Sequence, residues 1–385
     1  MIPIQDIQQK YGTEMALVLL CCRVFLKTEK STALGSFIEQ HPPDWQTVYE
    51  LSKTHRIRPI IYETVIAADH LNARFKQQLK QFFLNHSLHA FHCQQKATRM
   101  ISLMKQHNIP VQLYKGIHLS QQLYNHLSIR EFGDMDFIVR KEDIPRLVPV
   151  LKENGYKIEG EELFISSQEN YLAHQKDIIC YDRTQDGTFL YEFHYKPIGS
   201  YFATNISFGD LLPPYWKIGH EFSACDYLPL LTVNHGLVDL YPSLRCMTDI
   251  AMIMQKCMQD QHYRLDQKLS GYYGLNAYVV KQLFNIDSTT LPFQKDQKFI
   301  TSLGKKIIQR LLKKNKPGRV PTSAILKASF LLRNGVSEKL KLIKAIIKYI
   351  LTPNYNDTPQ KQFKYKWMYL ISRPLRLIQH AKRHV

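Results

Sequence analysis

The sequence predicts an α+β fold, in which a small α/β core with a mixed sheet is flanked by helical N-terminal and C-terminal regions. Apolar residues recur at three- and four-residue spacing before residue 106, which is the period of helices that bury one face. Short apolar and aromatic runs follow, separated by turn residues, which is typical of strands. Helical spacing then returns. With 385 residues the chain exceeds the usual size of a single core. We therefore divide it into a helical N-terminal region (1–105), a core (106–198), a helical lobe (199–300) and a basic helical segment (301–385).

Three helices are predicted in the N-terminal region. Their apolar residues recur over residues 14–27, 45–68 and 75–106, and His41-Pro42-Pro43 separates the first from the second. His55 lies within the second span, where we expect a core or capping histidine and not a catalytic one.

The first strand of the core is predicted at residues 109–114, where Lys115 and Gly116 end it. Residues 117–127 then have helical spacing of leucines. A glycine at a turn from strand to helix lets a phosphate approach the backbone at the helix N-terminus. Lys115 is placed to contact the same phosphate.

Two acidic residues, Asp134 and Asp136, open the next apolar strand. Residues i and i+2 of a strand share a face, so these carboxylates stand side by side while Met135 points toward a core. Such a pair resists burial unless a cation compensates it, and phosphoryl or nucleotidyl transfer uses Mg²⁺ for that purpose. The alternative is a solvated strand end or turn. Arg130 is either a second cation for a triphosphate or a structural partner of one of the two aspartates.

A hairpin supplies candidates for a third carboxylate. Its strands are predicted at residues 178–182 and 189–195. In the second strand the odd-numbered residues are aromatic and are expected to face the core, which leaves Glu192 and His194 together on the other face. A solvated strand face is the alternative for this pair, and Asp182 is the fallback for the third carboxylate.

In this order, these elements resemble the nucleotidyltransferase superfamily that includes DNA polymerase β and the CCA-adding enzymes. More closely, they resemble a bacterial family described only as nucleotidyltransferases, whose members show K-G, then R-x-x-x-D-x-D before an apolar strand, then G-Y. The chain matches these motifs at Lys115-Gly116, at Arg130-x-x-x-Asp134-x-Asp136 and at Gly155-Tyr156. It also matches the acidic-apolar-His strand of that family at residues 192–194.

The resemblance implies a bacterial nucleotidyltransferase that moves a nucleoside monophosphate from a nucleoside triphosphate to a hydroxyl acceptor and releases pyrophosphate. Asp134, Asp136 and Glu192 would bind two Mg²⁺ ions, with Glu192 as the base. The triphosphate, with ATP among the candidates, would be held by Lys115, Gly116, Arg130, Gly133 and His194. The acceptor stays open between a protein, a small molecule and RNA, and so does the choice of nucleotide.

The net charge of +18 lies entirely in the last segment of the chain. Residues 301–385 hold 20 Lys and Arg against two acidic residues, whereas residues 1–300 hold 31 of each sign. Within this segment a basic amphipathic helix is predicted. Its lysines at 341, 344 and 348 share one face, and its isoleucines at 343, 346, 347 and 350 share the other.

Four roles stay open for this basic segment. It could contact a nucleic acid, an anionic membrane surface, or a phosphorylated substrate held against the core. It could also be an ordinary helix that docks its isoleucine face and solvates its lysines. The alternative function for the chain is a catalytically inactive nucleotidyltransferase-like module that binds a nucleic acid or an anionic membrane surface through this segment.

Cysteine usage and hydropathy indicate a cytoplasmic protein. The seven cysteines are irregularly spaced and form no C-x-x-C pair, so we expect reduced thiols and no structural zinc. The apolar run at residues 15–22 is too short for a signal core or a transmembrane segment. Further along, Arg245 and Asp249 are four residues apart and are expected to form an ion pair on a helix.

Overall fold

The computed structural model describes residues 1–66, 72–166, 168–184, 187–199, 206–214, 216–258, 267–287, 297–313, 320–333, 335–351 and 368. Within these ranges the chain has an α+β fold with a five-stranded mixed sheet and helical flanks, which confirms the predicted fold class. Of the basic segment, residues 314–319, 334, 352–367 and 369–385 lie outside the described part.

The N-terminal region is helical, as its apolar spacing predicts. Its helices are α1 (Ile4–Tyr11), α2 (Thr13–Phe25), α3 (Ser31–Gln40), α4 (Trp45–Thr54), α5 (Arg58–Val65) and α6 (Ala73–Gln106). The helix expected over residues 45–68 is instead two helices, because Arg56 has a φ of 56° and Pro59 stands in the first turn of α5. Residues 15–23 of α2 are all buried, which is typical of a helix packed on every side.

The sheet has the strand order β1-β2-β5-β4-β3. Its strands are β1 (Val111–Tyr114), β2 (Asp134–Val139), β3 (Lys157–Ile158), β4 (Asp177–Thr184) and β5 (Gly187–His194). β2 and β5 are parallel, whereas every other neighbouring pair is antiparallel. The helices α7 (Gly116–Tyr124), α8 (Ile144–Glu153), α9 (Glu161–Ser166) and α10 (Gln168–His174) connect the strands, with a short 3₁₀ turn (Lys141–Asp143) before α8.

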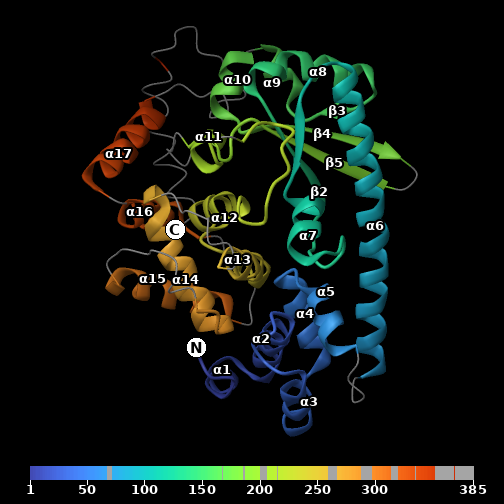
Figure 1. Cartoon of the computed structure of the whole chain (residues 1–385), viewed down its shortest axis with the longest axis vertical. Coiled ribbons are helices and arrows are strands. Elements are labelled where there is room, and N and C mark those ends of the chain that lie inside the picture. The colour runs from blue at the N-terminus through green and yellow to red at the C-terminus, as the bar shows by residue number, and fades with distance from the viewer. Residues whose placement is uncertain are drawn as a thin grey trace.

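One face of the sheet is closed by α6 and α8, and Figure 1 shows α6 running along the sheet. Met135, Phe137, Tyr191 and Phe193 point into this core and are each at most 1% exposed. The prediction that Met135 and the aromatic residues of the hairpin face a core is therefore confirmed. Because side chains alternate, the acidic residues of β2 and β5 point to the opposite face.

The opposite face of the sheet lies against the C-terminal lobe. The lobe begins with α11 (Phe208–Leu211), α12 (Tyr227–Leu231) and a π-helical segment (Thr232–Val238). It continues through α13 (Leu244–Cys257), a 3₁₀ turn (Gln267–Leu269), α14 (Ser270–Phe284), α15 (Gln297–Leu311), α16 (Thr322–Leu332) and α17 (Gly335–Leu351). Tyr114 at the end of β1 makes ring contacts with Phe208, Phe222 and Tyr227 of the lobe.

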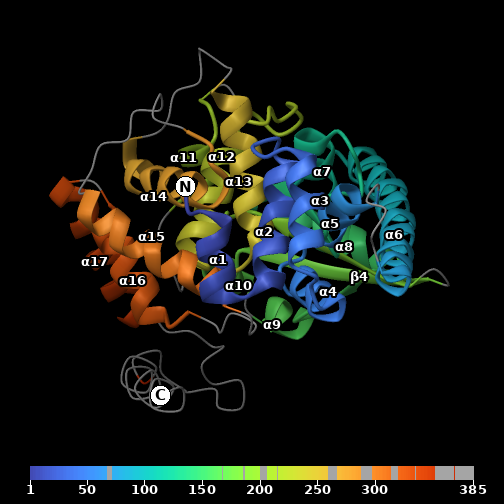
Figure 2. The ribbon, with the colours of Figure 1, turned by 90° about the horizontal axis from the view of Figure 1, so that it is seen from below.

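The N-terminal helices and the C-terminal lobe share one apolar core. Buried residues of α2, α13 and α14 belong to the same cluster, and Figure 2 shows α1 and α2 beside α13 and α14. Helices of the N-terminal region thus pack against helices of the C-terminal lobe.

The structure corrects the expectation that the thiols are all reduced. Cys225 and Cys257 form a disulfide, because the fold brings the start of α12 and the end of α13 together with a Cα separation of 5.4 Å. The remaining described cysteines are free and buried: Cys21, Cys22, Cys93, Cys180 and Cys246. No helix in the described part of the chain is long and apolar enough to cross a membrane.

Candidate functional site

The aspartates of β2 stand where the alternation of the strand places them. Asp134 is the first residue of the strand and is half-buried, whereas Asp136 is 6% exposed. Both point away from the core that holds Met135. They lie at the N-terminal end of β2, next to the turn that carries Lys115 and Gly116.

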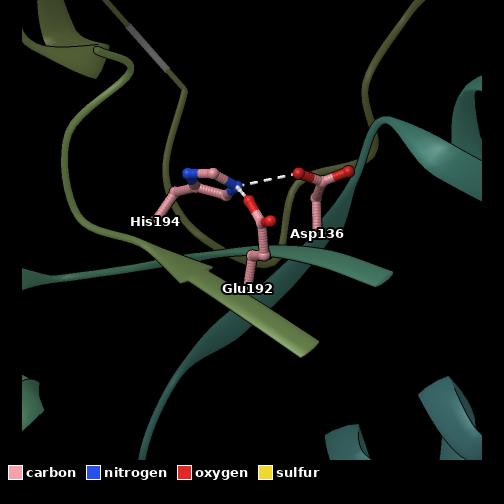
Figure 3. A group of neighbouring side chains, drawn as sticks. All are labelled: Asp136, Glu192 and His194. Carbon is pink, nitrogen blue, oxygen red and sulfur yellow. Dashed lines mark hydrogen bonds and ion pairs between the residues drawn. The ribbon is translucent and has the colours of Figure 1, made fainter. Parts of the chain in front are cut away.

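The parallel pairing of β2 with β5 brings a third acidic residue and a histidine to this position. Asp136 lies opposite Glu192, and the following pairs of the ladder reach His194. His194 Nε2 is 2.8 Å from Asp136 Oδ1 and 3.3 Å from Glu192 Oε2. Figure 3 shows both carboxylates directed at this one ring nitrogen. Asp136, Glu192 and His194 together form a group that could hold a metal ion, and we call it the carboxylate–histidine cluster.

The geometry of the cluster fits a divalent cation. Its candidate ligand atoms lie within 4.8 Å of one another. Two neighbouring ligands of an octahedral ion, each about 2.1 Å from it, are about 3 Å apart, so the printed separations of 2.8 Å and 3.3 Å match adjacent coordination positions. Carboxylate oxygen and imidazole nitrogen are both ordinary ligands of divalent metals.

Two lysines balance the charge of these carboxylates. Lys115 Nζ is 4.0 Å from Asp136 Oδ1, and Lys176 Nζ is 3.3 Å from Glu192 Oε2. Burial alone would raise the pKa of Asp136, but the charge of Lys115 and the hydrogen bond with His194 outweigh it and lower the pKa. Burial likewise opposes ionisation of Glu192, yet His194, Lys176 and Lys115 lower its pKa well below the ordinary value. Both side chains are therefore held as carboxylates, which is the form that binds a cation.

Asp134 stands beside the cluster in a different electrostatic environment. Burial raises its pKa, and the charges of Asp136 and Glu192 raise it further, although Lys115 partly offsets them. Of the two aspartates predicted as metal ligands, the structure thus brings Asp136 into the group of atoms that converge, while Asp134 adds a neighbouring carboxyl.

The turn before α7 lies directly against the acidic strand. Gly116 has a φ of +39°, and a Cβ placed on it would be 3.0 Å from the carbonyl oxygen of Asp134. Lys115 also has a positive φ of 52°, which is costly for a residue with a side chain and is found where function or packing enforces it. α7 begins at this point, so its N-terminus, which favours anions, starts next to the carboxylates.

The structure does not bring the Arg130 guanidinium onto this cluster. Arg130 is 4% exposed, and its Nε donates to Asp249 Oδ2 at 2.9 Å. Its structural partner is therefore an aspartate of α13, not one of the β2 aspartates. The prediction that Arg245 pairs with Asp249 is also wrong. Asp249 is paired with Arg130, and Arg245 Nη1 instead donates to the carbonyl oxygen of Glu131 at 2.7 Å.

Two other predicted residues lie apart from the cluster. Gly133 is exposed, and a Cβ placed on it would meet nothing within 4 Å. Asp182 accepts from Lys96 Nζ at 2.8 Å and lies within 3.3 Å of the Tyr191 hydroxyl on the face covered by α6. Its side chain points to that face because it pairs with Phe189, an aromatic residue of the core face. Glu192 is thus the third carboxylate at this end of the sheet.

Sequence reasoning missed Lys176 and Asp177. Asp177 lies directly opposite His194 in the β4–β5 ladder, and its Oδ2 is 3.5 Å from His194 Nδ1. Lys176 contacts both Asp177 and Glu192. The signal was in the hairpin: Thr184 pairs with Gly187, and this register alone places Asp177 beside His194.

The comparisons with known proteins agree with this site. The family described as "Uncharacterised nucleotidyltransferase" matches residues 41–269, which include the sheet, the cluster and the first half of the lobe. No curated protein and no solved structure matches the chain.

Proposed function

The chain belongs to this uncharacterised nucleotidyltransferase family, and from that membership we propose that it moves a nucleoside monophosphate from a nucleoside triphosphate to a hydroxyl acceptor. One observation carries the proposal: two ionised carboxylates and an imidazole converge on one face of the inner strands β2 and β5. Lys115 and Lys176 balance this charge in the structure, and a bound cation would compensate the converging carboxylates directly.

Asp136, Glu192 and His194 are the proposed ligands of a divalent metal ion, and Asp134 is the proposed additional ligand of a second. We propose Mg²⁺ as the physiological ion. When bound, the metal would neutralise the charge of the triphosphate and of the leaving pyrophosphate. Asp136 and Glu192 supply the negative charge that holds the ion, and His194 lies between their two carboxylates.

The triphosphate is proposed to lie along the turn at Lys115 and Gly116. The absence of a side chain at Gly116 allows close approach to the backbone, and the N-terminus of α7 favours a phosphate. Lys115 reaches the same region, with its ammonium group 4.0 Å from Asp136. Gly133 remains a proposed contact of the nucleotide, and Arg130 is proposed to act on it through its charge and not by contact, because its guanidinium is held by Asp249.

The proposed reaction is an in-line displacement at the α-phosphorus. The acceptor hydroxyl forms a new P–O bond while the bond to the β-phosphate oxygen breaks, and pyrophosphate leaves with that electron pair. Glu192 takes the proton of the hydroxyl. The acceptor is a protein, a small molecule or RNA.

Calorimetric titration of ATP, GTP, CTP and UTP, each with Mg²⁺ or Mn²⁺, tests the site. We expect at least one nucleotide to bind the wild-type protein and EDTA to abolish its binding. Asp136→Asn and Glu192→Gln are each expected to weaken binding by about tenfold or more, because each removes a charged ligand. Asp182→Asn is the matched control, since it neutralises a carboxylate on the same sheet but on the other face. Thermal unfolding followed by circular dichroism confirms that each variant is folded.

The control also separates the two candidates for the third carboxylate. Loss of binding in Asp182→Asn with unchanged binding in Glu192→Gln would contradict the assignment of Glu192. Metal-independent binding that survives in Asp136→Asn would instead support the alternative of a catalytically inactive nucleotidyltransferase-like module.

A further inference from the structure

The last described helix, α17, presents an apolar stripe to solvent. Val336, Leu340, Ile343 and Ile347 are 73%, 58%, 41% and 51% exposed. Their spacing of four, three and four residues places them on one face of the helix. Of the isoleucine face that an ordinary docked helix would bury, Ile343 and Ile347 are thus exposed, whereas Ile346 is half-buried and the side chain of Ile350 lies outside the described part.

α17 is attached to the lobe through a different face. Leu342 is 1% exposed and, with Ala345 of the next turn, lines a cavity of about 440 Å³. The wall across this cavity is formed by residues of α11 and α14 and by the chain just before α14. The face of α17 that turns toward the lobe is therefore not the apolar stripe.

Cations border the stripe on both sides. Lys344 and Lys348 follow Leu340 at four-residue spacing and are exposed at the rim of the cavity, which they also line, whereas Lys339 precedes Ile343 by four residues on the other side. Glu338 is the single acidic residue of α17, and it is already engaged by Lys341 at 2.6 Å and by Arg333 at 3.7 Å. The surface of α17 is thus aliphatic in the centre and cationic at its margins.

This combination selects among anionic partners. A nucleic acid would use the lysines, but it gains nothing from a row of four aliphatic side chains. An anionic lipid surface uses both, because the stripe enters the boundary of the acyl chains while the lysines reach the phosphates of the headgroups. The 17 residues of α17 are about 25 Å long, and no described helix can cross a bilayer, so such a helix lies in the plane of the surface.

We propose that α17 docks the protein on an anionic lipid bilayer through Val336, Leu340, Ile343 and Ile347. Both views place α17 at the edge of the described part of the molecule, on the side opposite α6 (Figures 1 and 2). The whole basic segment, of which α17 is a part, is positively charged, with 20 Lys and Arg against two acidic residues over residues 301–385. This charge favours an anionic surface. The proposal does not depend on nucleotidyl transfer.

Co-sedimentation of the full-length protein with vesicles tests the proposal. One vesicle population contains phosphatidylcholine alone, and the other contains phosphatidylcholine mixed with phosphatidylglycerol. We expect binding to the mixed vesicles only. Ile343→Asp/Ile347→Asp is expected to lower the partition coefficient by about tenfold or more, and Lys344→Gln/Lys348→Gln by roughly twentyfold.

A second exposed apolar stripe provides the matched control. Leu84 and Leu88 of α6 are 52% and 57% exposed, but residues 81–95 contain no lysine or arginine. Leu84→Asp/Leu88→Asp therefore removes the same kind of side chain from a surface that is poorer in cations, where Lys80 is the basic residue within four positions of Leu84. This variant is expected to bind the mixed vesicles as the wild type does.

Three outcomes would overturn the proposal. They are failure of the wild type to bind the mixed vesicles, equal binding to both vesicle populations, and loss of binding in the α6 variant but not in the α17 stripe variant. A parallel titration with single-stranded RNA provides one further test. The proposal would also fail if RNA displaced the protein from the vesicles and bound the α17 stripe variant as tightly as the wild type, because the lysines would then bind a nucleic acid.

Discussion

His194 is the residue on which the account of the site depends. Its Nε2 faces Asp136 and Glu192, and its Nδ1 faces Asp177 at 3.5 Å. An imidazole that ligates a metal commonly has a carboxylate beside its other nitrogen, which fixes the orientation of the ring. Asp177 lies beside that nitrogen without a hydrogen bond to it, and a small movement of the ring would allow one.

The nitrogen of His194 predicts which ions the site prefers. Imidazole suits later first-row metals better than Mg²⁺, so we expect the protein to bind Mn²⁺ more tightly than Mg²⁺. His194→Asp replaces nitrogen by oxygen and is expected to reduce this preference, and Asp177→Asn is expected to weaken Mn²⁺ binding by about tenfold. Calorimetric titration of each metal measures both effects. An unchanged ratio of the two affinities in His194→Asp would show that His194 is not a ligand.

A second histidine makes stability depend on pH. The fully buried His55 caps α13, because its Nδ1 accepts from the Leu244 amide at 3.2 Å. The prediction of a core or capping histidine is confirmed. Burial lowers the pKa of His55 from 6.5 to about 4.

The lowered pKa of His55 gives the sign of the effect. The unfolded chain takes up the proton near pH 6.5, but the folded protein resists it until about pH 4, so the stabilisation is complete above pH 6.5 and is lost as the pH falls toward 4. The loss amounts to about 3 kcal/mol. Urea unfolding across this range measures it, and His55→Asn, which keeps an acceptor but does not titrate, is expected to flatten the dependence. An equally steep dependence in His55→Asn would assign it to other groups.

At the scale of elements, the turn between β1 and α7 positions the strand that carries the aspartates. Gly116→Ala would place a methyl group 3.0 Å from the carbonyl oxygen of Asp134, at a φ of +39°. We expect a loss of about 1–3 kcal/mol in the free energy of unfolding, together with weaker nucleotide binding, because β2 must shift. Gly155→Ala is the control, since Gly155 also has a positive φ but no atom within 4 Å of a Cβ. If both variants bind nucleotide equally well, the close packing at Gly116 has no role in the site.

The alternation of side chains along the sequence predicted the strands of the site well, but it did not predict how neighbouring strands pair. Alternation along β2 and β5 was enough to place Asp134, Asp136, Glu192 and His194 on one face. Lys176 and Asp177 were missed because the hairpin turn was not assigned to the residue, and a shift of one position moves every cross-strand partner. The split of the helix over residues 45–68 was missed because apolar spacing continues across the interruption at Arg56.

At the scale of the whole molecule, the dipeptide Arg130-Glu131 joins three regions of the chain. Arg130 pairs with Asp249 of α13, which also accepts from the Tyr124 hydroxyl of α7 at 2.7 Å. Glu131 pairs with Arg58 of α5 at 2.7 Å. The sheet is thereby tied both to the N-terminal helices and to the C-terminal lobe.

Breaking the buried part of this connection is expected to be costly. Asp249→Asn leaves the Arg130 charge buried and uncompensated, for which we expect a loss of about 3–5 kcal/mol in the free energy of unfolding. Asp287→Asn is the control, because the pair it forms with Lys281 is exposed on both sides and is worth about 1 kcal/mol or less. Urea unfolding of both variants gives the comparison. A loss in Asp249→Asn as small as in the control would show that the pair does not brace the fold.

Contacts between distant segments were beyond the reach of sequence periodicity. The division of the chain into consecutive regions remains a prediction, and it did not foresee that α2 shares a core with α13 and α14. The partner of Arg130 lies 119 residues away, and the Cys225–Cys257 disulfide closes a separation of 32 residues. Spacing along the chain reports which face of an element is buried, but not which element covers it.

The most direct test of nucleotidyl transfer is the fate of the label from nucleoside triphosphates labelled at the α- or the γ-phosphorus. The protein is incubated with a cell extract and Mg²⁺ or Mn²⁺, and the label in protein, RNA and small-molecule fractions is measured. We expect the α-label, and not the γ-label, to enter one fraction with wild-type protein, and Asp136→Asn to abolish it while Asp182→Asn does not. Transfer of the γ-label, or equal transfer of the α-label by Asp136→Asn, would contradict nucleotidyl transfer at this site.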